Sequence, residues 1–248
     1  MKAVIDIGNT TIAIGLTNDG LTIDKVYRLN TEKNRSYDEY SVLLKEFLPP
    51  CEEAIVSSVV PELNEVFREF FQQNCNIIPL FLGQGLKTGI QIIVDNPKEV
   101  GADLIGNSVA ASNLYDETCL IIDLGTATTF TYIEKKTLKG VIISTGLTTS
   151  KNALINKASL LSQIELLPPK KMLGTNSTDA VKSGLLYGHA SMIDGIIQRV
   201  KKLLNKNDLT VVLTGGHAKV IYPLTNEKMI LDDSLILKGL LILLNKNH

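Results

Sequence analysis

The 248-residue chain has few cysteines, few histidines and no strong excess of charge of one sign. Its three cysteines form no CxxC pair and no metal-ligand spacing, and their odd number favours reduced thiols in the cytoplasm over a disulfide framework. No two histidines stand at ligand spacing, which argues against a transition-metal site. A formal net charge of −1 gives no overall basic field, so nucleic acid is not expected as a partner.

Long hydrophobic runs are also missing. The longest apolar tract, Leu235–Leu244, is interrupted by Lys238 and Gly239 and is too short to cross a bilayer, so it predicts a buried helix and no membrane association. The N-terminus enters a predicted strand directly, without the basic and apolar regions of a signal peptide. A cytoplasmic location is therefore expected. The length is enough for one large domain or two smaller ones.

One pattern is present twice. Residues 4–12 have the sequence VIDIGNTTI, and residues 121–129 have the sequence IIDLGTATT. Each copy is a short β-branched run that carries one carboxylate, Asp6 or Asp123, and then turns at a glycine. The two copies lie near the start of the first and second halves of the chain, which predicts a duplicated fold.

The residues of the first copy suit a phosphate group and its cation. Gly8 permits positive φ and close approach of another group to the backbone. Side-chain and backbone donors follow it at Asn9, Thr10 and Thr11. These donors can hold phosphate oxygens while Asp6 holds a metal ion or its waters. An ordinary hairpin with an Asx turn uses the same residue types, but the occurrence of a second copy favours the phosphate site.

Each half opens with three predicted strands, and helices follow. The predicted strands are 2–7, 11–16, 22–29, 54–60, 77–82 and 90–94 in the first half, and 120–124, 126–133, 138–144 and 211–213 in the second. The predicted helices are 37–47, 61–73 and 101–115, then 147–161, a long helix from about 175 to 204, and 232–244. A short polar break near 115–118 predicts two domains, 1–116 and 117–248, packed around a cleft.

These residues resemble a known family. The duplicated strand–Asp–turn unit is similar to the acetate kinase, sugar kinase, heat-shock protein 70 and actin superfamily. The resemblance implies an α/β fold of two ribonuclease-H-like halves, each a β-meander plus helices, around a nucleotide cleft. More closely, the chain resembles the type III pantothenate kinases over nearly its whole length. The matching segments are DIGNT at 6–10, SSVVP at 57–61, NPKEVGAD at 96–103, DLGTATT at 123–129 and TGG at 214–216.

The resemblance implies transfer of the ATP γ-phosphoryl group to pantothenate, giving 4′-phosphopantothenate, the first step of coenzyme A synthesis. It makes Asp103 the general base, with Gly101, Ala102 and Ser177 beside the acceptor. The implied nucleotide-binding residues are Asp6, Gly8, Asn9, Thr10, Thr11, Thr126, Gly215 and Gly216. Asp6 and Asp123 are the implied residues for Mg²⁺ and for a monovalent cation, K⁺ or NH₄⁺. Family members are homodimers, and Ser177, where the family usually has threonine, is the candidate for a partner-donated residue.

The sequence departs from the family pattern most clearly at Leu104. The family usually has arginine after the aspartate of its Gly-Ala-Asp segment, and leucine can neither donate a hydrogen bond nor pair with a carboxylate. Weaker acceptor binding is therefore expected, although Lys87 and Lys98 flank this segment and could replace part of the charge. A smaller departure places Thr145 where proline usually precedes Gly146. Two alternatives stay open: a non-catalytic or regulatory nucleotide-binding paralogue, and a kinase for another small hydroxyl-bearing acceptor.

Overall fold

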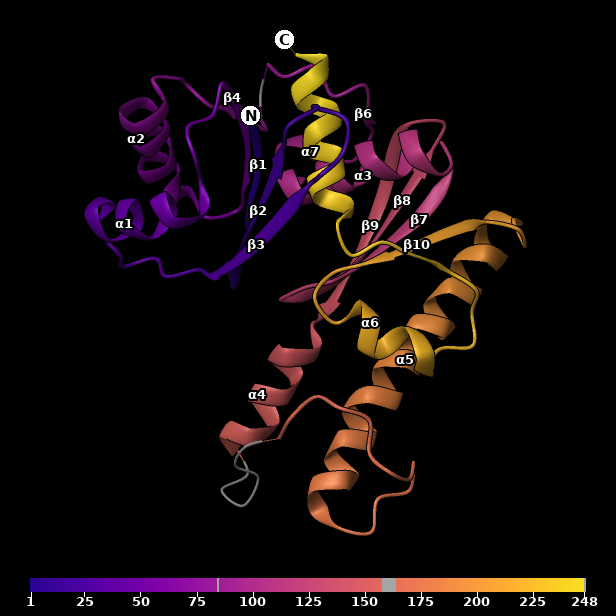
Figure 1. The fold of residues 1–248 in the computed structure, drawn as a ribbon. Helices are drawn as coiled ribbons and strands as arrows, with labels where there is room; N and C mark the ends of the chain where they lie inside the picture. Colours follow the sequence, from indigo (N-terminus) through magenta and orange to yellow (C-terminus); the bar gives the residue numbers. More distant parts are fainter. Residues whose placement is uncertain (84, 158–163, 248) are drawn as a thin grey trace. The chain divides into compact units, whose positions relative to one another are not determined.

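The computed structural model describes residues 1–83, 85–157 and 164–247. The chain forms two compact units, coloured along the sequence in Figure 1. Unit 1 contains Met1–Tyr115, Lys136–Leu138 and Ser234–His248, and unit 2 contains Asp116–Lys135 and Lys139–Asp233. The first division lies at the polar break where a boundary was predicted. The end of the chain departs from the predicted halves, because its last helix is part of unit 1.

Unit 1 is built on a five-stranded sheet in the order β3-β2-β1-β4-β5. Its strands are β1 (Lys2–Ile7), β2 (Thr11–Thr17), β3 (Lys25–Asn30), β4 (Glu53–Ser58) and β5 (Leu80–Phe81). Its α-helices are α1 (Tyr37–Phe47), α2 (Asn64–Cys75), α3 (Ala102–Leu114) and α7 (Leu235–Lys246), and 3₁₀ turns cover Pro61–Leu63 and Pro97–Glu99. β1 runs antiparallel to β2 and parallel to β4, so the predicted meander forms the start of the unit.

The helices α1 and α2 cover one face of this sheet, on the side away from α7 in Figure 1. Alternate residues of the central strands point into this core together with aromatic side chains of the two helices. The cluster includes Ala3, Ile5, Ile7, Ala54, Val56, Tyr40, Phe67, Phe70 and Phe71. The intervening residues of β1 and β4 therefore face the opposite side, which α3 and α7 cover.

The helices α3 and α7 pack closely because glycines meet at their crossing. A Cβ atom on Gly239 would collide with the carbonyl oxygen of Gly106. The small residues that predicted close packing of α3 therefore accommodate the last helix of the chain.

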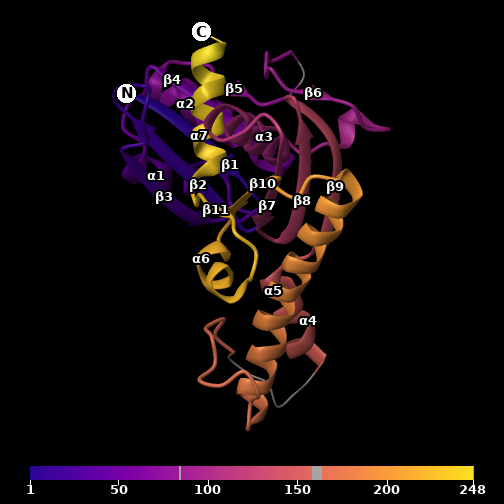
Figure 2. The same ribbon diagram turned by 90° about the vertical axis from the view of Figure 1, so that its right-hand side faces the viewer.

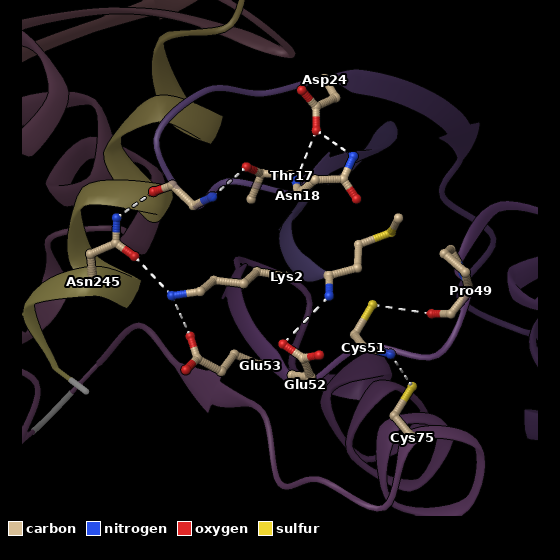
Figure 3. Close-up of polar contacts among 12 residues, drawn as sticks. Lys2, Thr17, Asn18, Asp24, Pro49, Cys51, Glu52, Glu53, Cys75 and Asn245 are labelled. Carbon is tan, nitrogen blue, oxygen red and sulfur yellow. Dashed lines mark hydrogen bonds and ion pairs between the residues drawn. The ribbon is translucent and has the colours of Figure 1, made fainter.

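The end of α7 is tied to unit 1 by a polar network around Lys2, drawn in Figure 3. The Lys2 ammonium donates to Asn245 Oδ1 at 3.1 Å and pairs with the Glu53 carboxylate at 2.7 Å. Asn245 Nδ2 in turn donates to the carbonyl oxygen of Gly20 at 2.6 Å. These contacts connect β1, β4, α7 and the loop between β2 and β3, and they explain why α7 belongs to this unit.

Unit 2 repeats the strand order of unit 1, as β11-β10-β7-β8-β9. Its strands are β7 (Cys119–Leu124), β8 (Ala127–Glu134), β9 (Thr137–Thr145), β10 (Thr210–Thr214) and β11 (Ile230–Leu231). β7 is antiparallel to β8 and parallel to β10, as β1 is to β2 and β4. The first two residues of β9, Thr137 and Leu138, count with unit 1, where they pair with β6 (Gln91–Ile92).

The helices of unit 2 are α4 (Leu147–Lys157), α5 (Ser177–Leu204) and α6 (Ala218–Ile221), and a 3₁₀ turn follows at Tyr222–Leu224. The helix predicted at 147–161 is present as α4, and its last four predicted positions lie outside the described residues. Figure 2 shows α5 continuing well beyond the strands of its own unit, with α4 beside it. Within the described parts of the chain, no helix combines the length and apolar character needed to cross a membrane.

Candidate functional site

The first glycine turn lies at the end of β1, where Asp6 is the half-buried penultimate residue. The Gly8 N–H donates to the carbonyl oxygen of Thr11 at 3.0 Å, and Thr31 Oγ1 donates to the carbonyl oxygen of Gly8 at 2.7 Å. Gly8 does not adopt a positive φ. Its close approach to Thr11, rather than a left-handed conformation, is the reason that a side chain is disfavoured there. The exposed residues of this turn are Asn9, Thr10 and Thr11.

The predicted acceptor segment forms the start of α3, in unit 1. Asp103 is the second residue of the helix, and its Oδ1 accepts from the N–H of Leu104 at 2.9 Å. A Cβ on Gly101 would collide with that same Oδ1 atom and would lie 3.8 Å from Val59 Cγ1. Gly101 therefore leaves space for the Asp103 carboxylate and brings it near the SSVVP segment. Ala102 is the half-buried residue between them.

Burial gives Asp103 the electrostatic character of a proton acceptor. Removal from water raises the pKa of this carboxyl, and the backbone N–H groups of Leu104 and of Asp103 itself lower it by a smaller amount. A carboxylate with a raised pKa binds a proton more readily than an ordinary surface aspartate. The geometry thus supports acid–base chemistry at the start of α3.

Leu104 is the third residue of α3 and is only 8% exposed. Its backbone is fixed in the helix, and its carbonyl oxygen accepts from Ser108 Oγ at 2.7 Å. The residue that replaces the family arginine is therefore an apolar side chain in the interior of unit 1.

The second glycine turn, in unit 2, follows β7, where Asp123 is again the half-buried penultimate residue. The Gly125 N–H donates to the carbonyl oxygen of Ala127 at 3.1 Å. The carbonyl oxygen of Thr126 accepts from the Gly146 N–H at 3.2 Å and from Thr149 Oγ1 at 2.8 Å. These bonds hold the start of α4 against the turn.

The segment after β10 approaches the second turn through its backbone. Gly215 has φ of 98°, in the left-handed region that favours glycine. A Cβ there would collide with the Asp123 carboxylate and with the N–H nitrogen of Leu124. A Cβ on Gly216 would meet nothing within 4 Å. Of the two predicted glycines, Gly215 is thus the one that the geometry requires.

Two histidines, both in unit 2, make hydrogen bonds that the sequence did not predict. His217 is the N-cap residue of α6, and its Nε2 lies 2.8 Å from Thr148 Oγ1. His189 Nε2 lies 2.8 Å from Thr128 Oγ1. Burial lowers the pKa of both imidazoles, and the charge of Lys151 lowers the pKa of His217 further. No spacing along the sequence pairs these histidines with their threonines.

Ser177 lies far along α5 from the glycine turn of its own unit, unit 2. It is the exposed first residue of α5, and His189, which contacts β8, lies about 18 Å farther along the helix at 1.5 Å per residue. The other predicted site residues are divided between the two units. Unit 1 holds Asp6, Gly8, Asn9, Thr10, Thr11, Gly101, Ala102 and Asp103, and unit 2 holds Asp123, Thr126, Gly215 and Gly216.

The arrangement offers oxygen ligands to a cation. Among the residues that the structure describes, no three histidine, cysteine, aspartate or glutamate side chains converge as a metal site. Mg²⁺ is commonly bound by one or two carboxylates together with substrate phosphates. A single half-buried aspartate at each glycine turn fits that mode of binding.

The repeated strand order and the glycine turns define an α/β protein of two ribonuclease-H-like halves. An activator of 2-hydroxyisocaproyl-CoA dehydratase from Clostridium difficile, solved with bound ADPNP, shares this fold with a TM-score of 0.57. The match covers 99% of this chain and 93% of that one at 16% sequence identity.

The sequence comparisons identify the family. The type III pantothenate kinase family model matches residues 3–199. The type III pantothenate kinase of Halalkalibacterium halodurans is 37% identical over 255 residues, covering 100% of both chains. That of Bacillus cytotoxicus is 38% identical over 255 residues, covering 100% of this chain and 97% of the relative. The chain belongs to the type III pantothenate kinase family, which confirms the resemblance seen in its motifs.

Proposed function

We propose that the protein is a kinase that transfers the γ-phosphoryl group of ATP to the primary hydroxyl of pantothenate. The product is 4′-phosphopantothenate, the first intermediate of coenzyme A synthesis. The observation that carries this proposal is the end-to-end match to relatives named type III pantothenate kinases. The presence of all three carboxylates, Asp6, Asp103 and Asp123, supports an active enzyme over a non-catalytic paralogue.

Asp103 acts as the general base in this proposal. Its carboxylate lies at the start of α3, where Gly101 carries no side chain to obstruct it. Burial raises its pKa, so it takes up the hydroxyl proton more readily as the acceptor oxygen attacks phosphorus. Gly101 and Ala102 supply the backbone surface against which the acceptor lies. The displaced ADP keeps the bridging oxygen, and the proton remains on Asp103 until solvent removes it.

The two glycine turns serve the nucleotide. Exposed donors at Asn9, Thr10 and Thr11 face phosphate oxygens, and Thr126 with the glycine segment at 215–216 forms the nucleotide side of unit 2. Asp6 would hold Mg²⁺ or its waters, and Asp123 would hold phosphate waters or a monovalent cation, K⁺ or NH₄⁺. The cations, when bound, neutralise charge on the phosphates and on the phosphoryl group in transfer.

Leu104 favours a second candidate, a kinase for another small hydroxyl-bearing acceptor. Its buried apolar side chain stands where the family has a charged donor. A different acceptor could therefore be preferred. The two candidates share the nucleotide site and the general base, and they differ in the acceptor alcohol.

The proposed working form is a cytoplasmic homodimer in which Ser177 reaches the acceptor site of the partner. Ser177 stands at the exposed end of α5, remote along the helix from the glycine turn of its own unit. Three large apolar residues before it in the sequence are exposed to solvent: Leu167 is 53% exposed, Met172 is 61% exposed and Leu173 is 85% exposed. Exposed apolar residues grouped in this way are typical of a surface that another chain covers.

The proposal is tested by coupled detection of ADP release with and without pantothenate. The expected result is pantothenate-dependent release by the wild-type protein, slowed about 10²–10⁴-fold in Asp103→Asn. ADP release that depends on another alcohol but not on pantothenate would support the second candidate. A protein that binds ATP and releases no ADP with any small alcohol would be the regulatory paralogue.

A further inference from the structure

Ser57, the fifth residue of β4, is a polar residue that the proposed mechanism does not use. Its side chain is completely buried, and among the residues that the structure describes its Oγ has no hydrogen-bond partner. A buried hydroxyl without a partner loses its bonds to water and gains nothing in return, so it destabilises the fold. Such a group calls for a functional explanation.

The register of the sheet places this hydroxyl beside the carboxylate of the first glycine turn. β1 and β4 are parallel, and Asp6 is the direct partner of Ser57. Directly paired residues of neighbouring strands project from the same face of a sheet. That face is the one opposite the α1 and α2 core, because Ile5 and Val56, the preceding residues of the two strands, point into that core.

The pairs of β1 and β4 residues along this face are charged at one end, apolar in the middle (Val4 with Ile55) and polar at the turn. Lys2 and Glu53 form the first pair and are joined by an ion pair of 2.7 Å. The last pair on this face is Asp6 with Ser57, next to the first glycine turn.

Unit 2 has the same combination. Asp123 of β7 is the direct partner of Thr214 of β10, again on parallel strands. Thr214 is also buried, and the residues before this pair, Ile122 and Leu213, belong to the main core of unit 2. A hydroxyl therefore accompanies the turn carboxylate in both units, although the residues that follow it differ.

We propose that Ser57 is a positioning residue for the cation site at Asp6. Its O–H donates to one oxygen of the Asp6 carboxylate when the nucleotide and its divalent cation are bound. The other carboxylate oxygen is thereby held toward the cation or its waters. The inference rests on the proposed nucleotide site but not on the identity of the acceptor, because the cation is bound with the nucleotide.

The experiment measures Mn²⁺ binding to the full-length protein in the presence of ADP, by electron paramagnetic resonance of free Mn²⁺, without pantothenate. Ser57→Ala is expected to weaken Mn²⁺ binding about tenfold, the effect of losing one hydrogen bond to a charged group. Its thermal midpoint should equal or exceed that of the wild type, because an unpartnered buried hydroxyl is removed. Ser57→Thr, which restores the hydroxyl as in unit 2, should recover most of the Mn²⁺ affinity.

Ser58 provides the matched control. Its Oγ donates to the carbonyl oxygen of Val60 and accepts from the Val60 N–H, both at 3.1 Å. Ser58→Ala should therefore lower the thermal midpoint and leave the Mn²⁺ affinity unchanged.

Unchanged Mn²⁺ affinity in Ser57→Ala would overturn the proposal, as would an equal loss in Ser58→Ala. Because no acceptor is present, the result is independent of whether pantothenate is the substrate. Failure of pantothenate turnover with a positive Mn²⁺ result would count against the proposed function alone.

Discussion

The two glycine turns share one strand order and one register, and they differ in what lies against the carboxylate. Beside Asp6, the neighbouring strand β4 carries Ser57, and the residues that follow, Ser58 and Val59, are not glycines. Beside Asp123, it ends in Thr214 and continues with two glycines, the first of which has its backbone directly against the carboxylate. The carboxylate therefore has a side chain beside it in unit 1, and a glycine backbone directly against it in unit 2.

This difference indicates a division of chemistry between the units. Unit 1 also contains the start of α3, where a half-buried carboxylate with a raised pKa is available for proton transfer. Unit 2 contains the close glycine approach, the buried imidazole of His189 and the half-buried imidazole of His217. In the proposed function both glycine turns serve the nucleotide, and unit 1 also carries the acceptor reaction. Substitutions in each unit should separate the two roles.

The largest effect is expected at Asp103 of unit 1. Asp103→Asn should lower kcat by about 10²–10⁴, the usual contribution of general-base assistance, with little change in the KM for ATP. Because burial raises the pKa of Asp103, the acidic limb of the wild-type kcat/KM profile should lie above the ordinary aspartate range. That limb should be absent from the residual activity of the variant. Near wild-type turnover by Asp103→Asn would remove this residue from the mechanism.

The next effect concerns acceptor binding at Leu104. A charge-assisted hydrogen bond contributes about 1.5–3 kcal/mol, and each 1.4 kcal/mol is about tenfold in affinity. We therefore expect a high KM for pantothenate in the wild type, and a KM roughly ten- to a hundredfold lower in Leu104→Arg. The KM for ATP should change little.

Leu104→Met is the matched control, because it keeps an apolar side chain of similar volume in the same buried position. Thermal midpoints of both variants would show whether the new charge disturbs the interior. If the wild type already binds pantothenate tightly, another group, such as Lys98, has taken over the contact. A KM that stays high in Leu104→Arg would favour a different acceptor.

A third substitution tests the backbone approach in unit 2. Gly215→Ala places a side chain at φ of 98° and against the Asp123 carboxylate. Strain of this kind costs about 1–3 kcal/mol, so both the thermal midpoint and the affinity for ATP should fall. Gly216→Ala should be nearly silent, because its Cβ meets nothing within 4 Å. Gly8→Ala should lie between them, since its Cβ would stand 3.1 Å from the Thr11 carbonyl oxygen. Equal effects at all three glycines would erase the proposed difference between the turns.

The central elements could be predicted because their patterns are local. The short β-branched run in β1 and the helical spacing in α1 were sufficient to give both spans as the structure has them. Elements that depend on remote partners were predicted less well. The strand predicted at 22–29 begins at Lys25, because Asp19 extends the turn by accepting from the N–H groups of Leu21 and Thr22. The helix predicted from 232 begins at Leu235, because the Asp232 N–H pairs with the carbonyl oxygen of Leu213.

The candidate site also has parts that local patterns predict and parts that depend on remote partners. Motifs located both carboxylate turns, but the pairing of Asp6 with Ser57 depends on the register of parallel strands, which no short segment encodes. The return of α7 to unit 1 was not predicted either. An apolar helix indicates that it will be buried without indicating against which core.

The smallest expected effect is on the pH dependence of the free energy of unfolding, which should differ between titratable groups of the two units. The pKa of His217 is lowered by burial and by Lys151, so the folded protein resists a proton that the unfolded chain accepts near pH 6.5. The free energy of unfolding should therefore fall as pH drops through 6.5 toward the folded pKa. His217→Gln cannot be protonated and can still bond Thr148, so urea unfolding at pH 7.5, 6.5 and 5.5 should show a shallower decline. The difference should be on the order of 1.4 kcal/mol per unit of pKa shift.

His189→Gln provides the comparison within unit 2. Burial and the charge of His217 lower the pKa of His189, so its replacement should act in the same direction, and the double variant should show the flattest decline. Asp103 of unit 1 should act in the opposite direction. Its raised pKa means that acidification through that pKa relieves the cost of a buried charge and stabilises the fold. A decline that is as steep in the double histidine variant as in the wild type would show that unit 2 does not set the acid sensitivity of the protein.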